Sequence, residues 1–281
     1  MRAGVFSLAL LTASVDAGAW CQTTTVPEQP DPMMCPAEGR PIAWVSGCTG
    51  FRFDPTALPD PAVISREALT LVLDRSARAW ASVACDRDTR AAPSFVLARL
   101  PDGPSTVGYD PAGGNTNTVL FRTTWGFDAF HPADAAAVTI VTFGARSASI
   151  LDADTELNLR GPTNPRGFLF SVTGDTRSAD LQTIVTHEFG HAMGLAHSGL
   201  RDAVMWYTAG RGEQRQVPSA DDALGICTMY PPGRFAVCDP DVRTARFGGG
   251  GLRCHASPGR AEAPVALLLA LAAVLTARRR G

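Results

Sequence analysis

Apolar residues spaced three or four positions apart predict the helices of this chain. Such spacing runs over 64–83, and again over 180–193 through Leu181, Ile184, Val185 and Phe189. A third helix is expected to begin near residue 219. The candidate N-caps are Asp60 or Ser65 for the first helix, Ser178 or Asp180 for the second, and Ser219 for the third.

Short β-rich runs separated by Gly, Pro and Asn clusters predict the strands. These runs lie at 41–45, 51–53, 95–97, 119–121, 138–143 and 149–157. These helices and strands fall between residues 41 and 232, which we treat as one folded domain.

Composition narrows the class of protein. The 281 residues are 45% hydrophobic, which is enough for a packed core. The net charge of −2 gives no excess of basic residues that would indicate nucleic-acid binding. Seven cysteines indicate disulfides and hence an oxidising compartment. Cys48 and Cys85 flank the first helix and could pair, although sequence alone does not fix the connectivity.

The N-terminal end has the features of a secretory signal peptide. A positive start is followed by an apolar run and by Ala17-Gly18-Ala19, so 1–19 is predicted to be removed. Cys21 raises a lipoprotein alternative, which Trp20 disfavours because a small residue is required there. Residues 20–40 are polar and Pro-rich and are expected to form a short extended leader.

The C-terminal end divides into two parts. Residues 233–263 are rich in Gly, Pro and Cys and are predicted to be a linker, whereas 264–277 are apolar and precede Arg278-Arg279-Arg280. The apolar run is short for a membrane span, so we expect an apolar helix with an Arg-rich tail over 264–281. With Cys254 as attachment point, this tail resembles the C-terminal sorting tails of myxobacterial surface proteins. The alternative is a plain C-terminal helix.

The strongest chemical signal is H-E-x-x-H-x-x-G-x-x-H, which begins at His187. His187 and His191 are one helical turn apart and can meet one metal ion. Gly194 can adopt positive φ and end the helix, so that His197 returns as a third ligand. Three nitrogens leave one open position on a tetrahedral zinc ion, as in catalytic sites. The alternative is a set of ordinary polar residues on an amphipathic helix.

This motif, Ser198 after it and Met205 downstream resemble the metzincin zinc proteases, and among them the matrixins in a secreted bacterial form. The resemblance implies an α+β zincin fold, with a twisted, mixed five-stranded sheet, about three helices and an active-site helix followed by a Met-turn at Met205. It implies that Asp221 and Asp222 tie down the Met-turn and the N-terminus. Tyr207 matches a tyrosine that helps to stabilise the oxyanion in some metzincins, or else it is a packing aromatic.

The chain also departs from vertebrate matrixins. Val141 and Leu151 stand where ligands of a second, structural zinc are expected, so we predict one catalytic zinc only. Asp152, Asp154 and Glu156 could supply oxygens to calcium; the alternative is the solvent face of a strand. Cys35 could cap the zinc, although a disulfide fits better because the usual surrounding motif is missing.

The resemblance implies a zinc metalloendopeptidase that cleaves peptide bonds with a zinc-bound water and Glu188 as general base. Residues 139–143 would pair with an extended peptide substrate. Arg211 or Arg215 could influence substrate preference, or be solvated loop charges. We expect a monomer, secreted or attached to the cell surface or membrane through its tail. The alternative functions are a non-catalytic zinc-binding adhesion module on a protease fold and a metal-dependent amidase that acts on a non-protein substrate.

Overall fold

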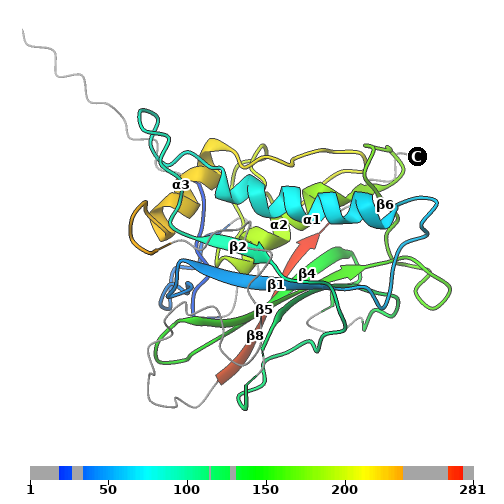
Figure 1. Cartoon of the computed structure of the whole chain (residues 1–281), viewed down its shortest axis with the longest axis horizontal. Helices are drawn as coiled ribbons and strands as arrows, with labels where there is room; N and C mark the ends of the chain where they lie inside the picture. The colour runs from blue at the N-terminus through cyan, green and yellow to red at the C-terminus, as the bar shows by residue number, and fades with distance from the viewer. Residues whose placement is uncertain (1–18, 27–33, 114, 127–130, 237–264, 275–281) are drawn as a thin grey trace, which may run out of the picture.

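The computed structural model describes residues 19–26, 34–113, 115–126 and 131–236, and the backbone of 265–274. Its frame is a mixed sheet with strand order β2-β1-β3-β5-β4-β8 (Figure 1). The strands are β1 Cys48–Asp54, β2 Val96–Arg99, β3 Asn117–Arg122, β4 Ala135–Phe143, β5 Ile150–Asn158 and β8 Val265–Val274. Strands β2, β1, β3 and β5 are parallel, whereas β4 runs antiparallel to β5. The predicted α+β fold with a mixed sheet of five strands is confirmed by β1–β5, and β8 adds a sixth strand.

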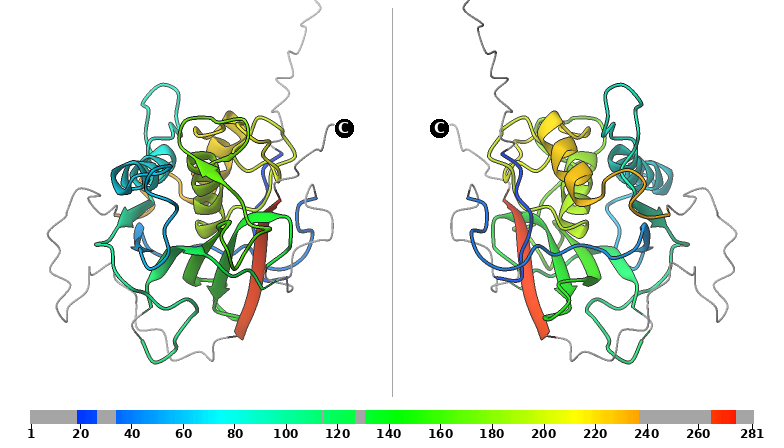
Figure 2. Two further views of the ribbon diagram at one scale, coloured as in Figure 1. Left: turned by 90° about the vertical axis from the view of Figure 1, so that its right-hand side faces the viewer. Right: turned by 90° about the vertical axis from the view of Figure 1, so that its left-hand side faces the viewer.

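Three helices gather on one face of this sheet (Figure 2). They are α1 Arg66–Ala81, α2 Leu181–Ala192 and α3 Ala220–Met229. Ser65 begins α1 by accepting a hydrogen bond from the Ala68 amide, and Asp180 begins α2 by accepting one from the Thr183 amide. Ser219 and Asp222 form a capping box at α3. The caps at Ser65, Asp180 and Ser219 were all among the predicted ones.

Two buried tryptophans fix α2 over the sheet. Trp44 Nε1 donates to the Ala192 carbonyl and Trp80 Nε1 to the Thr186 carbonyl, each at 2.8 Å. On the inner face of α2, the Phe189 ring lies 4.8 Å from that of Phe51 on β1. Because these indole groups end on backbone oxygens, they set the position of α2 along its axis as well as its distance from the sheet.

The disulfides differ from the predicted one. Cys85 pairs with Cys227 of α3, and Cys21 pairs with Cys35. Cys48 is disulfide-bonded as well, but not to Cys85, so the proposed Cys48–Cys85 pair is wrong. The chain past α1 turns toward α3 and brings the Cys85 and Cys227 Cα atoms within 5.4 Å. Cys35 therefore has the disulfide role that the sequence favoured.

Within the C-terminal apolar segment, Val265–Val274 form a strand, so the predicted helix is wrong over these residues. Residues Val265–Val274 form β8, which pairs antiparallel with β4 from Val265 opposite Phe143 to Val274 opposite Ala135. An edge strand offers unpaired N–H and C=O groups, and this apolar segment satisfies them. The outer edge of β4, which was predicted to pair with a peptide substrate, is thus paired with β8 of the same chain.

Several predicted segments lie outside the described residues: the signal peptide apart from Ala19, most of the 233–263 linker, and Arg278–Arg280. In the described part of the chain, no helix is long and apolar enough to cross a bilayer. The predicted strand at 41–45 reduces to isolated bridges, of Pro41 with Thr24 and of Ala43 with Ser149.

Candidate metal centre

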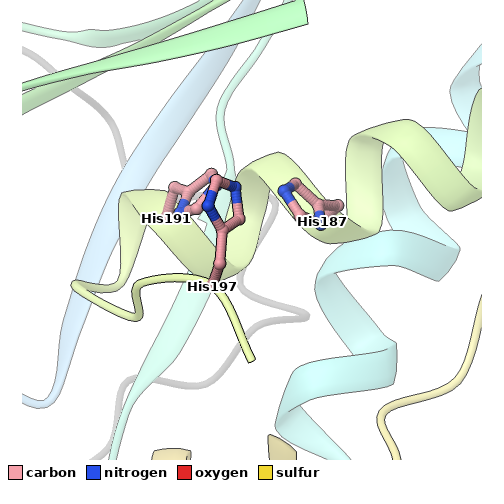
Figure 3. Close-up of side chains that lie close together, drawn as sticks. All are labelled: His187, His191 and His197. Atoms are coloured by element: carbon pink, nitrogen blue, oxygen red, sulfur yellow. The ribbon is translucent and has the colours of Figure 1, made fainter. Parts of the chain in front are cut away.

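Three histidine side chains converge beside the C-terminal half of α2. His187 and His191 leave the same face of the helix, and His197 returns from the loop that follows (Figure 3). The ring centroids of His187 and His191 lie 4.6 Å apart, and that of His197 lies 5.4 Å and 4.9 Å from them. One donor atom from each residue lies within 4.8 Å of the others. The sequence predicted this convergence correctly.

The turn that returns His197 depends on Gly194 and on the N-terminal segment. Gly194 has φ of +100°, and a Cβ there would lie 2.8 Å from the Ile42 carbonyl oxygen, so only glycine fits without strain. The Thr23 amide donates to the Gly194 carbonyl at 2.9 Å, and the Ala196 amide donates to the Cys21 carbonyl at 2.9 Å. Cys21 and Thr23 of the predicted leader therefore support the loop that carries His197.

Hydrogen bonds to backbone carbonyls orient two of the rings. His187 Nδ1 lies 2.7 Å from the Val204 carbonyl, and His191 Nδ1 lies 2.9 Å from that of Leu195. A carbonyl only accepts, so Nδ1 holds the proton and Nε2 presents its lone pair. Both Nε2 atoms are buried and have no protein partner.

Burial also keeps these imidazoles neutral. It lowers the pKa of His187 to about 3 and that of His191 well below its usual range, with a smaller contribution from the neighbouring histidines. Neutral rings with buried, unpartnered Nε2 atoms are what a zinc ion requires of its ligands. The residues present therefore fit a zinc ion.

Glu188 lies next to this group, fully buried. Its Oε2 accepts a hydrogen bond of 2.7 Å from Thr139 Oγ1 of β4, while its Oε1 has no protein partner. Desolvation raises the pKa of Glu188 to about 8. Thr139 Oγ1 also lies 3.0 Å from Thr155 Oγ1 of β5, so the sheet positions the carboxylate. Sequence reasoning missed this role of Thr139, because only the placement of α2 across β4 reveals it.

Met205 lies buried against α2, as the Met-turn prediction requires. A Cβ on Gly190 would come within 2.2 Å of Met205 Sδ, which explains the glycine inside the helix. The carboxylate of Asp222 accepts hydrogen bonds from the Val204 and Met205 amides at 2.7 and 3.1 Å. Asp222 therefore holds the turn whose Val204 carbonyl orients His187.

Asp221 ties the N-terminal segment to the same region. Its Oδ1 accepts from the amides of Ala19 and Trp20 at 2.7 and 3.0 Å, and its Oδ2 accepts from Ser198 Oγ at 2.6 Å. The implied structural roles of Asp221 and Asp222 match these contacts.

The loop after Met205 lies beside the histidines and contributes Tyr207 and Ala209 to the surface next to them. The Tyr207 ring centroid lies 6.4 Å from that of His197, and Tyr207 and Ala209 line a small cavity together with His187. The Arg215 side chain is only 10% exposed and donates to the Arg201 carbonyl at 2.8 Å and to the Thr208 carbonyl. Arg215 is therefore an internal support of this loop, whereas Arg211 is exposed.

The carboxylates of β5 are buried, so they do not form the solvent face of a strand that was one alternative. Asp154 accepts from the Gly108 and Thr118 amides, and Arg122 donates to Glu156 at 3.1 Å. Asp152 shares a hydrogen bond with Asp154. Calcium binding by these residues stays a prediction, and the structure gives each of them protein partners.

The sequence profile of the matrixin family matches residues 122–231, which include β4, β5, α2 and α3. Over these residues the chain is matrixin-like. The α+β architecture is that of the matrixin, or metzincin, fold.

Plant proteins named metalloendoproteinases are among the similar sequences. The chain is 32% identical to Metalloendoproteinase 5-MMP of Arabidopsis thaliana over 81 residues, which cover 28% of this chain and 22% of that one. It is 34% identical to 2-MMP over 64 residues, covering 23% and 17%, and 39% identical to 1-MMP over 56 residues, covering 20% and 15%, both from the same plant. The chain thus spans about a fifth of the length of these relatives, or less.

Proposed function

We propose that this protein is a zinc-dependent endopeptidase. The observation that supports this most strongly is that three side-chain atoms on one short stretch of α2 are buried and unpartnered: Nε2 of His187, Nε2 of His191 and Oε1 of Glu188. Burying polar atoms without partners is costly, so a site that keeps three together is built for a ligand. A binding module would need the imidazoles but has no use for a buried carboxylate beside them.

The roles of the residues follow from their positions. His187, His191 and His197 would hold the zinc, which when bound lowers the pKa of its water and polarises the scissile carbonyl. Glu188 accepts a proton from the attacking water at Oε1 and returns it to the leaving nitrogen, while Thr139 keeps Oε2 in place. Tyr207, on the loop beside His197, donates a hydrogen bond to the oxyanion.

The substrate class proposed is a peptide or protein. The names of the plant relatives support proteolysis, and the residues matched by the matrixin profile include the whole centre. We also propose that the chain is exported and acts outside the cell or at its surface. The Cys21–Cys35 and Cys85–Cys227 disulfides support this, since such bonds persist mainly in oxidising compartments.

A quenched-fluorescence peptide library tests the proposal with purified, zinc-supplemented protein. We expect cleavage that a zinc chelator abolishes and added zinc restores. Glu188→Gln should retain zinc but lose about 10²–10⁴-fold in kcat, because it removes the proton acceptor. Glu67→Gln, an exposed change on α1, is the matched control and should match the parent.

The alternative functions give different results. An adhesion module would bind zinc yet cleave nothing in the library. A Glu188→Gln protein that retains full activity would remove Glu188 from the reaction. A peptide activity that survives complete removal of zinc would contradict the proposed metal dependence.

A further inference from the structure

A cavity of about 350 Å³ lies beside the N-terminal end of α2. It lies between the loop that follows β5, the β7 strand (Ala179–Asp180) and the loop that follows Met205. Its charged lining side chains are all arginines, and its other lining residues are Gly, Ala, Phe and Leu. The four arginines are Arg160, Arg166, Arg177 and Arg211.

The four arginines come from three separate loops and line one space. Arg160 follows β5, Arg177 precedes β7 and Arg211 lies in the loop after Met205. All are exposed residues, and none of the described residues that line the cavity is a carboxylate. Asp175 pairs with Arg177 at 3.4 Å, outside the lining. Gathered guanidinium groups repel each other and attract an anion, which they can bind through paired N–H donors.

The cavity lies within reach of a peptide bound at the histidines. Ala209 lines both this cavity and the smaller one beside His187. Ala179, which also lines this cavity, precedes α2 by two residues. The six steps from Leu181 to His187 span roughly 9 Å at the rise of a helix, and the two steps before them bring the distance to at least roughly 12 Å. An extended peptide covers this span in roughly three or four residues at ~3.3 Å each.

We propose that this cavity binds a carboxylate of the peptide substrate, two to four residues away from the scissile bond. The proposal rests on the peptidase function proposed above and adds a preference for acidic peptides. Phe168 and Leu169 would contact the aliphatic part of the bound residue, while Arg160 and Arg211 bind its carboxylate. A carboxylate can come from an Asp or Glu side chain or from the peptide C-terminus, and the test separates these two sources.

The test compares kcat/KM for matched peptides. One series carries Asp or Glu at each of the four positions on either side of the scissile bond, against Asn or Gln at the same position. A second series compares a free with an amidated C-terminus. We expect an acidic residue, or a free terminus, at one position within the two-to-four range to raise kcat/KM about tenfold, as a charge-assisted hydrogen bond does.

The variants assign that preference to the cavity. The double substitution Arg160→Gln/Arg211→Gln should reduce the acidic preference to about twofold or less and leave cleavage of the Asn or Gln peptides unchanged. Arg75→Gln/Arg87→Gln changes the net charge equally at exposed residues outside the cavity and should keep the preference. If both double variants lose it equally, general electrostatic attraction is responsible and the proposed site is wrong.

A binding measurement separates failure of the site from failure of the peptidase function. Zinc-loaded Glu188→Gln protein is titrated with a fluorescent acidic peptide and with its amide counterpart. Tighter binding of the acidic peptide that requires Arg160 and Arg211 supports the site even if nothing is cleaved. Cleavage without any acidic preference, together with equal binding of the two peptides, overturns the site and leaves the peptidase function standing.

Discussion

At the scale of single residues, the centre is defined by neighbours that are remote in sequence. His187 is oriented by the Val204 carbonyl, which is 17 positions away, and Glu188 is held by Thr139, which is 49 positions away. The H-E-x-x-H motif identifies the reacting side chains. The Val204 carbonyl and the Thr139 hydroxyl decide which imidazole nitrogen and which carboxylate oxygen are left for the metal and the substrate.

Gly190→Ala should destabilise the protein although it replaces glycine in a helix. In an exposed helix the change usually stabilises by about 0.5–1 kcal/mol. Here the added Cβ would lie 2.2 Å from Met205 Sδ and 2.9 Å from the Trp80 ring, so overpacking should cost about 1–3 kcal/mol. Urea denaturation measures the free energy of unfolding.

The double variant Gly190→Ala/Met205→Ala provides the control for this prediction. Removing the sulfur makes room for the new methyl group, so the cost of Gly190→Ala should shrink in that background. An equal cost in both backgrounds would mean that Met205 does not contact α2 in solution.

Thr139→Val should slow the reaction because the Glu188 carboxylate is no longer held in position. The isosteric change removes the hydroxyl that donates to Glu188 Oε2, so we expect kcat to fall about ten- to a hundredfold with little change in KM or zinc content. Thr139→Ser should restore most of the rate. Thr142→Val, another buried position on β4, is the matched control. A Thr139→Val enzyme with the parent kcat would remove Thr139 from the site.

At the scale of elements, the edge of the sheet is the least expected feature. The Ala- and Leu-rich composition of 264–277 favours a helix, yet Val265–Val274 pairs with β4. Long-range pairing overrides local propensity because an exposed edge strand gains a full ladder of backbone hydrogen bonds. An extended peptide that uses the outer edge of β4 would have to displace β8.

Removing residues 264–281 should therefore expose the outer edge of β4. We expect faster amide exchange along Ala135–Phe143 and a KM for peptides lowered by about fivefold or more, because a tethered competitor has been removed. A chain shortened only by Arg278–Gly281 is the control and should behave like the parent. Unchanged exchange in the 264–281 deletion would show that β8 does not pair with β4 in solution.

At the scale of the whole molecule, the metal centre could be predicted from the sequence more completely than the long-range contacts around it. Local patterns located the helices, their caps, the turn at Gly194 and the three histidines, because each depends on nearby residues. The Cys85–Cys227 disulfide and the β4–β8 pairing depend on which distant segments meet. The arginine cavity likewise unites loops that no periodicity connects, so sequence reasoning could not predict it.

The stability of the whole protein should fall as the pH rises because of a buried pair on β5. Burial, and next the Asp154 charge, raises the pKa of Asp152 to about 8 from its usual 3.8. The folded state thus keeps a proton that the unfolded state releases, so the stabilisation is complete below about pH 4 and is lost toward pH 8. The contribution of Asp152 to the slope should reach about 1.4 kcal/mol per pH unit.

Urea denaturation between pH 5 and pH 8 measures this slope. Asp152→Asn should reduce the slope by about that amount and should be more stable than the parent at pH 8, because the amide never ionises. Asp134→Asn, at an exposed position, should retain the parental slope. A parental slope in Asp152→Asn would show that Asp152 is ionised in the folded protein.

Zinc-edge X-ray absorption on the purified, zinc-supplemented protein tests the central claim most directly. We predict one zinc ion per chain, bound by three imidazole nitrogens at about 2.0–2.1 Å, and the loss of one of them in His197→Ala. A chain that binds no zinc under these conditions, or one whose zinc has sulfur ligands, would contradict the account.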